Sequence, residues 1–144
     1  MKTVAQLLAA KAQQDVYTTT PEASVLEALQ LMADKNVGAL PVMRGGELVG
    51  IVSERDYARK MVLQGRSSYA TPVSAIMTAA VIIILPSQSV AECLALMTEH
   101  RLRHLPVMGN GQLIGLLSIG DLVKEIMVEQ AALIRQLEGY IRGE

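Results

Sequence analysis

One stretch of this chain occurs twice: PEASVLEALQLMADKNVGALPVMRGGELVGIVSERDYARKM, residues 21–61, aligns without a gap on PSQSVAECLALMTEHRLRHLPVMGNGQLIGLLSIGDLVKEI, residues 86–126. The two copies are offset by a constant 65 residues, and 16 of the 41 aligned positions are identical. Such self-similarity indicates a duplicated supersecondary unit. Because two copies are too few for a stacked array, we expect them to face each other around a pseudo-twofold axis and to enclose a cleft.

The similarity extends to the segment that precedes each copy. VAQLL, residues 4–8, resembles VSAIM, residues 73–77, after a further shift of four residues. We therefore assign residues 1–65 to repeat 1 with its lead-in helix, and residues 66–144 to a linker, repeat 2 and an extended C-terminal helix. At 144 residues the two halves are expected to form one compact module.

The hydrophobic spacing inside each copy predicts the element order β-α-β-β-α. The predicted strands are residues 16–19, 39–43 and 48–52 in the first copy and residues 81–85, 105–108 and 113–117 in the second. Each first strand is rich in β-branched residues and ends at a proline. The first helix of each copy starts at a capping box, Ser24 with Glu27 and Ser89 with Glu92. The second helix starts after Ser53 in the first copy and after Ser118 in the second. The fold class is therefore α/β (α+β).

The composition narrows the class of protein. Just over half of the residues are hydrophobic, which excludes disorder of the whole chain, and the net charge of −1 gives no general attraction for nucleic acid or an anionic membrane. Cys93 is the only cysteine, so we predict a buried small hydrophobe and no disulfide framework. The sequence shows no signal-peptide pattern and no membrane span. We expect a cytoplasmic protein without a membrane partner.

A family resemblance rests on the LPV strand and on the motif that closes each copy. The motif is GIVSERD at residues 50–56 and GLLSIGD at residues 115–121, and together with the element order it resembles the CBS domain, named after cystathionine β-synthase. The resemblance covers nearly the entire chain. It implies a pair of CBS domains, often called a Bateman module, in its stand-alone form.

The resemblance also implies a function. Many CBS pairs bind the adenosine part of AMP, ADP, ATP, NAD or S-adenosylmethionine in the cleft between the repeats and report metabolite state. We therefore expect a regulatory sensor, not an enzyme, that signals to an unknown partner protein. The expected ligand is AMP first, then NAD, ATP or ADP, and S-adenosylmethionine, bound as a sensed ligand rather than as a catalytic cofactor.

Two composite sites follow from the resemblance, which places each Ser-x-x-Asp turn opposite the first strand and the LPV strand of the other repeat. Site A combines Ser53, Arg55 and Asp56 with Leu85, Arg103 and His104. Site B combines Ser118, Ile119, Gly120 and Asp121 with Thr20, Gly38 and Ala39. The aspartate would accept hydrogen bonds from a ribose diol, and the cations of site A would bind phosphate.

The same residues also have a purely structural interpretation, which the sequence leaves open. Ser-x-x-Asp is the spacing of a helix capping box, and the basic residues 100–104 suit a solvated helix end. His100 and His104 lie four residues apart, but no third ligand is placed beside them, so no metal is expected. Neither Ser53 nor Ser118 has a general base at a recognisable spacing, and no catalytic residue is predicted.

The C-terminal tail gives a second functional clue. Leu122, Ile126, Leu133, Leu137 and Ile141 continue a helical stripe well beyond the end of the equivalent helix in repeat 1. We expect this stripe to build a homodimer, the alternative being that it covers the subunit's own repeat. A structural or dimerisation module with vestigial ligand clefts is therefore the competing function.

Overall fold

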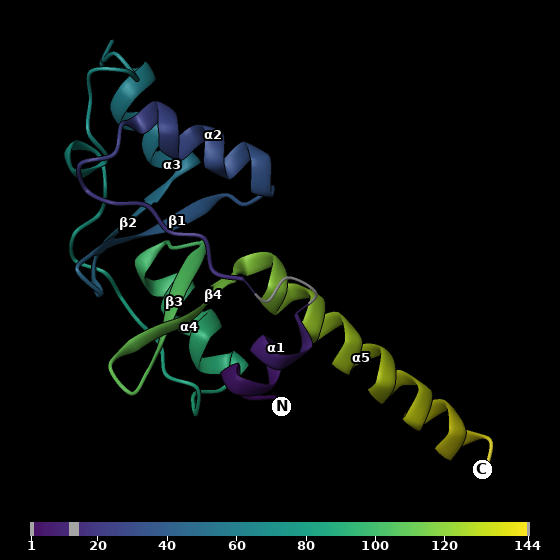
Figure 1. Ribbon diagram of the computed structural model, residues 1–144. Coiled ribbons are helices and arrows are strands. Elements are labelled where there is room, and N and C mark those ends of the chain that lie inside the picture. Colours follow the sequence, from purple (N-terminus) through teal and green to yellow (C-terminus); the bar gives the residue numbers. More distant parts are fainter. Residues whose placement is uncertain (1, 12–14, 144) are drawn as a thin grey trace. The chain divides into compact units, whose positions relative to one another are not determined.

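The computed structural model describes residues 2–11 and 15–143, which form two compact units (Figure 1). The repeat-1 unit contains residues 15–82 and 110–113. The repeat-2 unit contains residues 2–11, 83–109 and 114–143. Each repeat is built around a two-stranded sheet, so the mixed α and β fold with two equivalent repeats is confirmed.

The repeat-1 unit follows the predicted order of elements. Its members are α2 (Val25–Lys35), β1 (Ala39–Arg44), β2 (Glu47–Ser53), α3 (Glu54–Tyr57), the π-helical turn η1 (Ala58–Val62) and the 3₁₀ turn η2 (Val73–Ala75). Ser24 accepts a hydrogen bond from the backbone N–H of Glu27 and so caps α2. Strands β1 and β2 pair antiparallel, with Leu40 opposite Val52 in the core.

The repeat-2 unit contains the same elements together with the N-terminal helix. Its members are α1 (Val4–Ala10), α4 (Val90–His100), β3 (His104–Gly109), β4 (Gln112–Ser118) and α5 (Ile119–Ile141). The predicted capping box of Ser89 with Glu92 is present at α4, and the long C-terminal helix is confirmed. Cys93 is buried as predicted.

The predicted first strands are much shorter than expected. Thr19 forms a single parallel bridge with Val42, and Ile84 forms the equivalent bridge with Val107. Extending either ladder would require N–H donors from prolines on both sides of the bridge, namely Pro21 and Pro41 in repeat 1 and Pro86 and Pro106 in repeat 2. Because proline has no N–H, the ladder stops after one rung.

The two lead-in segments are exchanged between the repeats. The backbone N–H of Val4 donates to the carbonyl of Gln88 at 2.8 Å, so the N-terminal segment lies against the start of α4 in repeat 2. The N–H of Val25 donates to the carbonyl of Thr71 at 2.9 Å, so the segment before repeat 2 lies against the start of α2 in repeat 1. Residues 2–11 therefore group with repeat 2 although they precede repeat 1 in the sequence.

A glycine in the second strand of each repeat makes room for the exchanged lead-in. A Cβ atom on Gly115 would lie 2.6 Å from Cδ2 of Leu8, and a Cβ atom on Gly50 would lie 2.6 Å from Sδ of Met77. Leu8 and Met77 are equivalent positions of the two lead-ins, as Gly50 and Gly115 are of the two repeats. The repeated glycine therefore has a packing role.

Each unit has its own aliphatic core. The repeat-1 core comprises Val25, Ala28, Met32, Leu40, Val42, Val52, Met61, Val73 and Ile76. The repeat-2 unit buries Val4, Leu7, Ile84, Val90, Cys93, Met97, Leu105, Val107, Leu117 and Leu122. The buried residues of α2 and α4 recur every three or four positions, as on one face of a helix: Val25, Ala28 and Met32 in α2, and Val90, Cys93 and Met97 in α4.

Candidate ligand site

Both Ser-x-x-Asp turns form capping boxes at the start of a helix. The backbone N–H of Ser53 donates to Oδ2 of Asp56 at 2.9 Å, and the N–H of Asp56 donates to Oγ of Ser53 at 3.2 Å. In repeat 2 the corresponding distances for Ser118 and Asp121 are 2.8 and 3.2 Å. The predicted capping role of these motifs is therefore confirmed, and the capping bonds fix the orientation of both carboxylates.

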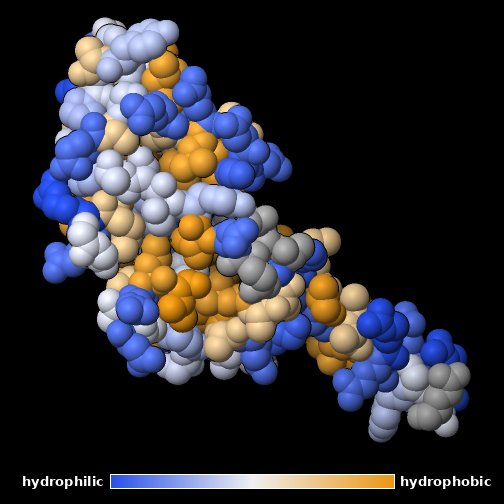
Figure 2. Space-filling view, viewed as in Figure 1, coloured by the Kyte–Doolittle hydropathy of each residue, from blue (hydrophilic) through white to orange (hydrophobic). Residues whose placement is uncertain are grey.

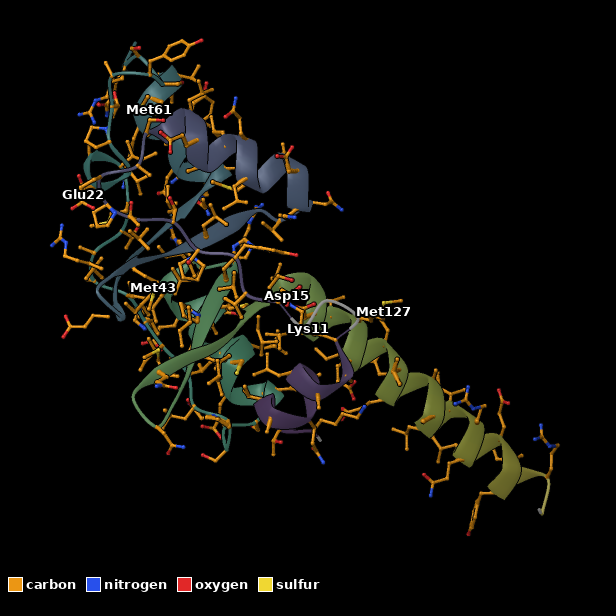
Figure 3. All side chains as sticks on the ribbon, viewed as in Figure 1. Lys11, Asp15, Glu22, Met43, Met61 and Met127 are labelled. Atoms are coloured by element: carbon orange, nitrogen blue, oxygen red, sulfur yellow. The ribbon has the colours of Figure 1, made fainter. Side chains whose placement is uncertain are left out.

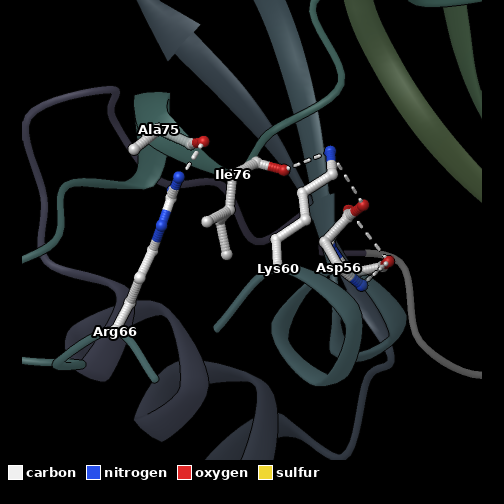
Figure 4. Close-up of polar contacts among 6 residues, drawn as sticks. Asp56, Lys60, Arg66, Ala75 and Ile76 are labelled. Atoms are coloured by element: carbon white, nitrogen blue, oxygen red, sulfur yellow. Dashed lines mark hydrogen bonds and ion pairs between the residues drawn. The ribbon is translucent and has the colours of Figure 1, made fainter. Parts of the chain in front are cut away.

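In repeat 1 the Asp56 carboxylate is held by a lysine of the same helical segment (Figure 4). Nζ of Lys60 lies 3.6 Å from Oδ1 of Asp56 and donates to the backbone carbonyl of Ile76 at 2.9 Å. Arg66 makes a longer bond of 3.4 Å to the carbonyl of Ala75. Both carbonyls belong to the exchanged lead-in, so these cations tie it to the repeat.

In repeat 2 the corresponding lysine comes from the N-terminal segment. Nζ of Lys11 lies 3.0 Å from Oδ2 of Asp121 and donates to the carbonyl of Leu116 at 2.9 Å. Figure 3 shows Lys11 beside the first turns of α5. Lys11 was not predicted as a site residue, because nothing in the similarity of the two repeats links it to Asp121.

A second ion pair anchors the same N-terminal segment. Nζ of Lys2 lies 3.3 Å from Oε2 of Glu125, whose side chain is only 8 % exposed. Oε1 of Glu125 is buried without a hydrogen-bond partner among the described residues. Glu125 occupies the position that Lys60 has in repeat 1, so the two repeats carry opposite charges there.

The start of the LPV strand lies beside the Ser-x-x-Asp turn of its own repeat. In repeat 2 the N–H of Ile119 donates to the carbonyl of Arg103 at 2.8 Å, and in repeat 1 the N–H of Glu54 donates to the carbonyl of Gly38 at 3.1 Å.

Burial lowers the pKa of His104, the first residue of β3. The carboxylate of Asp121 opposes this effect, whereas Lys11 and Arg103 add to it.

This arrangement offers recognition groups rather than a reaction centre. A fixed carboxylate can accept two hydrogen bonds from a sugar diol, and Lys11, Arg103 and His104 supply donors for an anion. His100 ends α4 whereas His104 begins β3, so the two do not share a helical face. Within residues 2–11 and 15–143, no group of three His, Cys, Asp or Glu side chains could hold a metal ion.

Both repeats of the chain match the model of a known domain family. A model of the CBS domain matches residues 5–63 and again residues 73–128. The chain belongs to the CBS-domain family. CBS domain pairs are regulatory modules. No helix in the described part of the chain is long and apolar enough to cross a membrane.

Known CBS proteins resemble this chain over most of its length. A CBS-domain protein from Burkholderia ambifaria MC40-6 is 58 % identical with a TM-score of 0.86, and the match covers 90 % of this chain and 96 % of that one. The mitochondrial CBS domain-containing protein CBSX3 of Arabidopsis thaliana is 42 % identical over 129 residues. That match covers 86 % of this chain and 63 % of CBSX3, so this chain spans less than two thirds of that relative.

A more distant structure carries ligands. The CBS domain pair of protein MJ0100, solved in complex with 5'-methylthioadenosine and S-adenosyl-L-methionine, is 22 % identical with a TM-score of 0.79. The match covers 90 % of this chain and 98 % of that one. At this identity the likeness shows a shared fold.

The predicted residues of each ligand site lie partly in one unit and partly in the other. The repeat-1 unit holds Ser53, Arg55 and Asp56 of site A with Thr20, Gly38 and Ala39 of site B. The repeat-2 unit holds Leu85, Arg103 and His104 of site A with Ser118, Ile119, Gly120 and Asp121 of site B. Each unit thus contains residues assigned to both sites. The pairing of residues across the repeats stays a prediction.

Proposed function

We propose that this CBS pair is a regulatory module that binds an adenosine-containing ligand at its Ser-x-x-Asp turns and signals ligand state to a partner protein. The observation that carries the proposal is the fixed carboxylate in each repeat. Oδ2 of Asp121 takes the bonds from Ser118 and Lys11, while Oδ1 takes part in neither contact. A ribose diol could use that oxygen and compete for the other.

The cations around the repeat-2 turn support a ligand with a phosphate group. Lys11 contacts Asp121 directly, and Arg103 and Lys11 both act on the charge of His104. We therefore rank AMP first, followed by NAD, ATP or ADP, and S-adenosylmethionine. These cations would bind the phosphate, and one aspartate would bind the ribose. That aspartate is Asp56 in the predicted site A, and Asp121 if the whole ligand binds to repeat 2.

The competing function is a structural module that assembles through α5. The observation in its favour is the exposed apolar surface of that helix, which includes Met127, Ile134 and Leu137. We propose that the protein forms a homodimer in either case. Ligand sensing and assembly are compatible, so the experiment must test the ligand directly.

Thermal unfolding with AMP, ADP, ATP, NAD and S-adenosylmethionine tests the sensor. A ligand at a hundred times its Kd adds roughly 2.7 kcal/mol of stability, which raises Tm by on the order of 5 °C for a chain of this size. If none of the five compounds moves Tm, the sensor proposal is wrong and the structural alternative stands.

Asparagine variants then locate the ligand. Asp56→Asn and Asp121→Asn keep the side-chain shape but remove the charge, and each Tm shift is read against the same variant without ligand. Asp34→Asn, on an exposed position of α2, is the matched control. A shift that survives at full size in both turn variants would contradict the assignment of the ligand to these turns.

A further inference from the structure

The helix α5 has one face in its unit and another face in solvent. Leu122 is fully buried and Glu125 nearly so, which fixes the inner face of the first turns. Val123, Met127, Ile134 and Ile141 lie on another side and are 44, 64, 55 and 82 % exposed. Figure 2 shows hydrophobic side chains at the surface of the first half of α5, and Figure 3 shows Met127 pointing outward from it.

The exposed face has the spacing of a helix–helix contact. Gly120, Met127, Ile134 and Ile141 recur every seven residues, and Ala131 lies between them on the same side. The first half of this face is a concave apolar surface lined by Gly120, Val123, Lys124, Met127, Val128 and Ala131. Small residues at two of these positions permit close approach of another helix.

We infer that a second copy of this chain covers this face, with the two α5 helices antiparallel and crossing near Ala131. In this register Met127 of one copy lies beside Ile134 of the other, and Gly120 lies beside Ile141. The apolar face is thus complementary to itself over a helix of 23 residues, about 34 Å long. The inference depends on the proposed homodimer but not on the ligand.

Charge selects the antiparallel orientation. Lys124 and Glu138 lie on the apolar face, at equal distances along the helix from Ala131. Antiparallel pairing brings Lys124 of each copy to Glu138 of the other, whereas parallel pairing brings each residue to its own counterpart and repeats like charges. The two residues are 14 positions apart, about 21 Å along the helix, so they cannot pair within one chain. Glu138 lies 4.0 Å from Arg142 of its own helix, an exposed pair that the intermolecular contact would share.

Charge reversal with rescue tests the pairing. Sedimentation velocity over a dilution series should give a dimer whose Kd rises roughly tenfold or more in Lys124→Glu and in Glu138→Lys. The double variant Lys124→Glu/Glu138→Lys should return to within about threefold of the parent, because it restores both intermolecular pairs. Asp34→Lys, an exposed change of the same size on α2, is the control and should leave the Kd unchanged.

Two other results would overturn the inference in different ways. A chain that is monomeric at all concentrations refutes the homodimer together with this contact, while the nucleotide titration still tests the sensor. A dimer that is insensitive to both single variants, or is not rescued by the double variant, refutes the α5 contact and leaves another surface for the homodimer.

Cysteine cross-linking tests the orientation. Lys124→Cys and Glu138→Cys chains, mixed and oxidised, should form a disulfide-linked heterodimer, while each variant alone should cross-link much less. Cys93 is buried and serves as an internal control. Efficient cross-linking of each variant with itself, and not in the mixture, would show a parallel pair and overturn the antiparallel register.

Discussion

The two Ser-x-x-Asp turns have the same capping geometry but are held by lysines of different origin. In repeat 1, Lys60 follows Asp56 by one helical turn and reaches out to a carbonyl of the exchanged lead-in. In repeat 2, Lys11 belongs to the exchanged lead-in itself and reaches in to Asp121 and to a carbonyl of β4. The same bond pattern, a carboxylate and a carbonyl joined by one ammonium group, thus arises in opposite directions.

The two repeats thus keep the same fold, while the cation that neutralises each aspartate comes from a different segment. The carboxylate of repeat 1 is neutralised by a lysine of its own helical segment, so this ion pair itself needs only local structure. The carboxylate of repeat 2 is neutralised by residues 2–11, so its environment depends on docking of the N-terminal segment. A ligand that competes for Asp121 would therefore act on that segment, whereas a ligand on Asp56 would not.

The largest effect is expected where the repeats carry opposite charges. Glu125→Lys gives repeat 2 the residue of repeat 1 and places a second cation beside Lys2, whose Nζ lies 3.3 Å from the Glu125 carboxylate in the parent. Lys2 is 44 % exposed but Glu125 is only 8 % exposed, and an unpaired cation at that nearly buried position costs about 3 kcal/mol, measured as the free energy of unfolding in urea. The rescue variant Lys2→Glu/Glu125→Lys should recover most of the loss. A cost below about 1 kcal/mol for Glu125→Lys would contradict the anchoring role of this pair.

The next largest effect concerns the glycines that receive the lead-ins. Gly50→Ala should destabilise the protein by about 2 kcal/mol and Gly115→Ala by about 1 kcal/mol. The added Cβ on Gly115 meets only the flexible Leu8 side chain, whereas on Gly50 it also lies 3.1 Å from the backbone oxygen of Thr78. That oxygen accepts the N–H of Ile51, so relaxation there strains a backbone bridge.

A third glycine provides the control for this pair. A Cβ on Gly120 would make only an ordinary 3.5 Å contact with Ser118, and alanine is the better helix former. Gly120→Ala should therefore be neutral or slightly stabilising in the same urea titration, run below the Kd of the proposed dimer because Gly120 lies in the α5 contact. If Gly115→Ala proved the more costly of the first two variants, the assignment of these glycines to lead-in packing would fail.

Smaller effects are expected from the two lysines that define the comparison. Lys11→Met and Lys60→Met should each cost about 0.5–1 kcal/mol, because both ion pairs are partly exposed. They should differ in hydrogen exchange: Lys11→Met should accelerate exchange of the α1 amides, and Lys60→Met should leave α1 unchanged. Equal exchange of α1 in the two variants would remove the proposed link between Asp121 and the N-terminal segment.

Much of this architecture follows from local signals. The serine caps and the hydrophobic spacing predicted the helices and hairpin strands, because each is decided within a few residues. The single-rung first bridges could also have been predicted, since Pro41 and Pro106 cannot donate the bonds of a longer ladder. The repetition of Gly50 as Gly115 can also be seen in the sequence, but the side chains that they contact, Met77 and Leu8, could not be predicted from it.

The exchange of lead-ins and the lysine at Asp121 could not be predicted in the same way. VAQLL and VSAIM resemble each other, and that similarity does not say which repeat either segment contacts. Lys11 bonds to the carbonyl of Leu116, a residue 105 positions away, and long-range pairing of one ammonium group leaves no periodic pattern. The aspartates were predicted because a motif marks them twice, whereas Lys11 has no counterpart in the second lead-in.

The smallest effect concerns His104, which has no titratable counterpart because Ala39 occupies its position in repeat 1. Burial lowers the pKa of His104 in the folded protein, whereas the unfolded chain keeps a pKa near about 6.5. The unfolded state therefore binds the proton first as pH falls. The contribution of neutral His104 to the free energy of unfolding is fully present above about pH 6.5, and it is lost as pH falls from there through the lowered folded pKa.

Two variants separate this contribution from those of the other titrating groups. His104→Gln should flatten the fall in unfolding free energy between about pH 6.5 and 5. His100→Gln, the same substitution at the end of α4, is the matched control. The folded pKa of His104, followed by NMR, should rise in Lys11→Met, since Lys11 lowers it, and should fall in Asp121→Asn, since Asp121 raises it. Opposite movements of the pKa in these two variants would show that repeat 2, unlike repeat 1, couples its carboxylate, its N-terminal lysine and a titratable ring. Movement in the same direction would contradict that coupling.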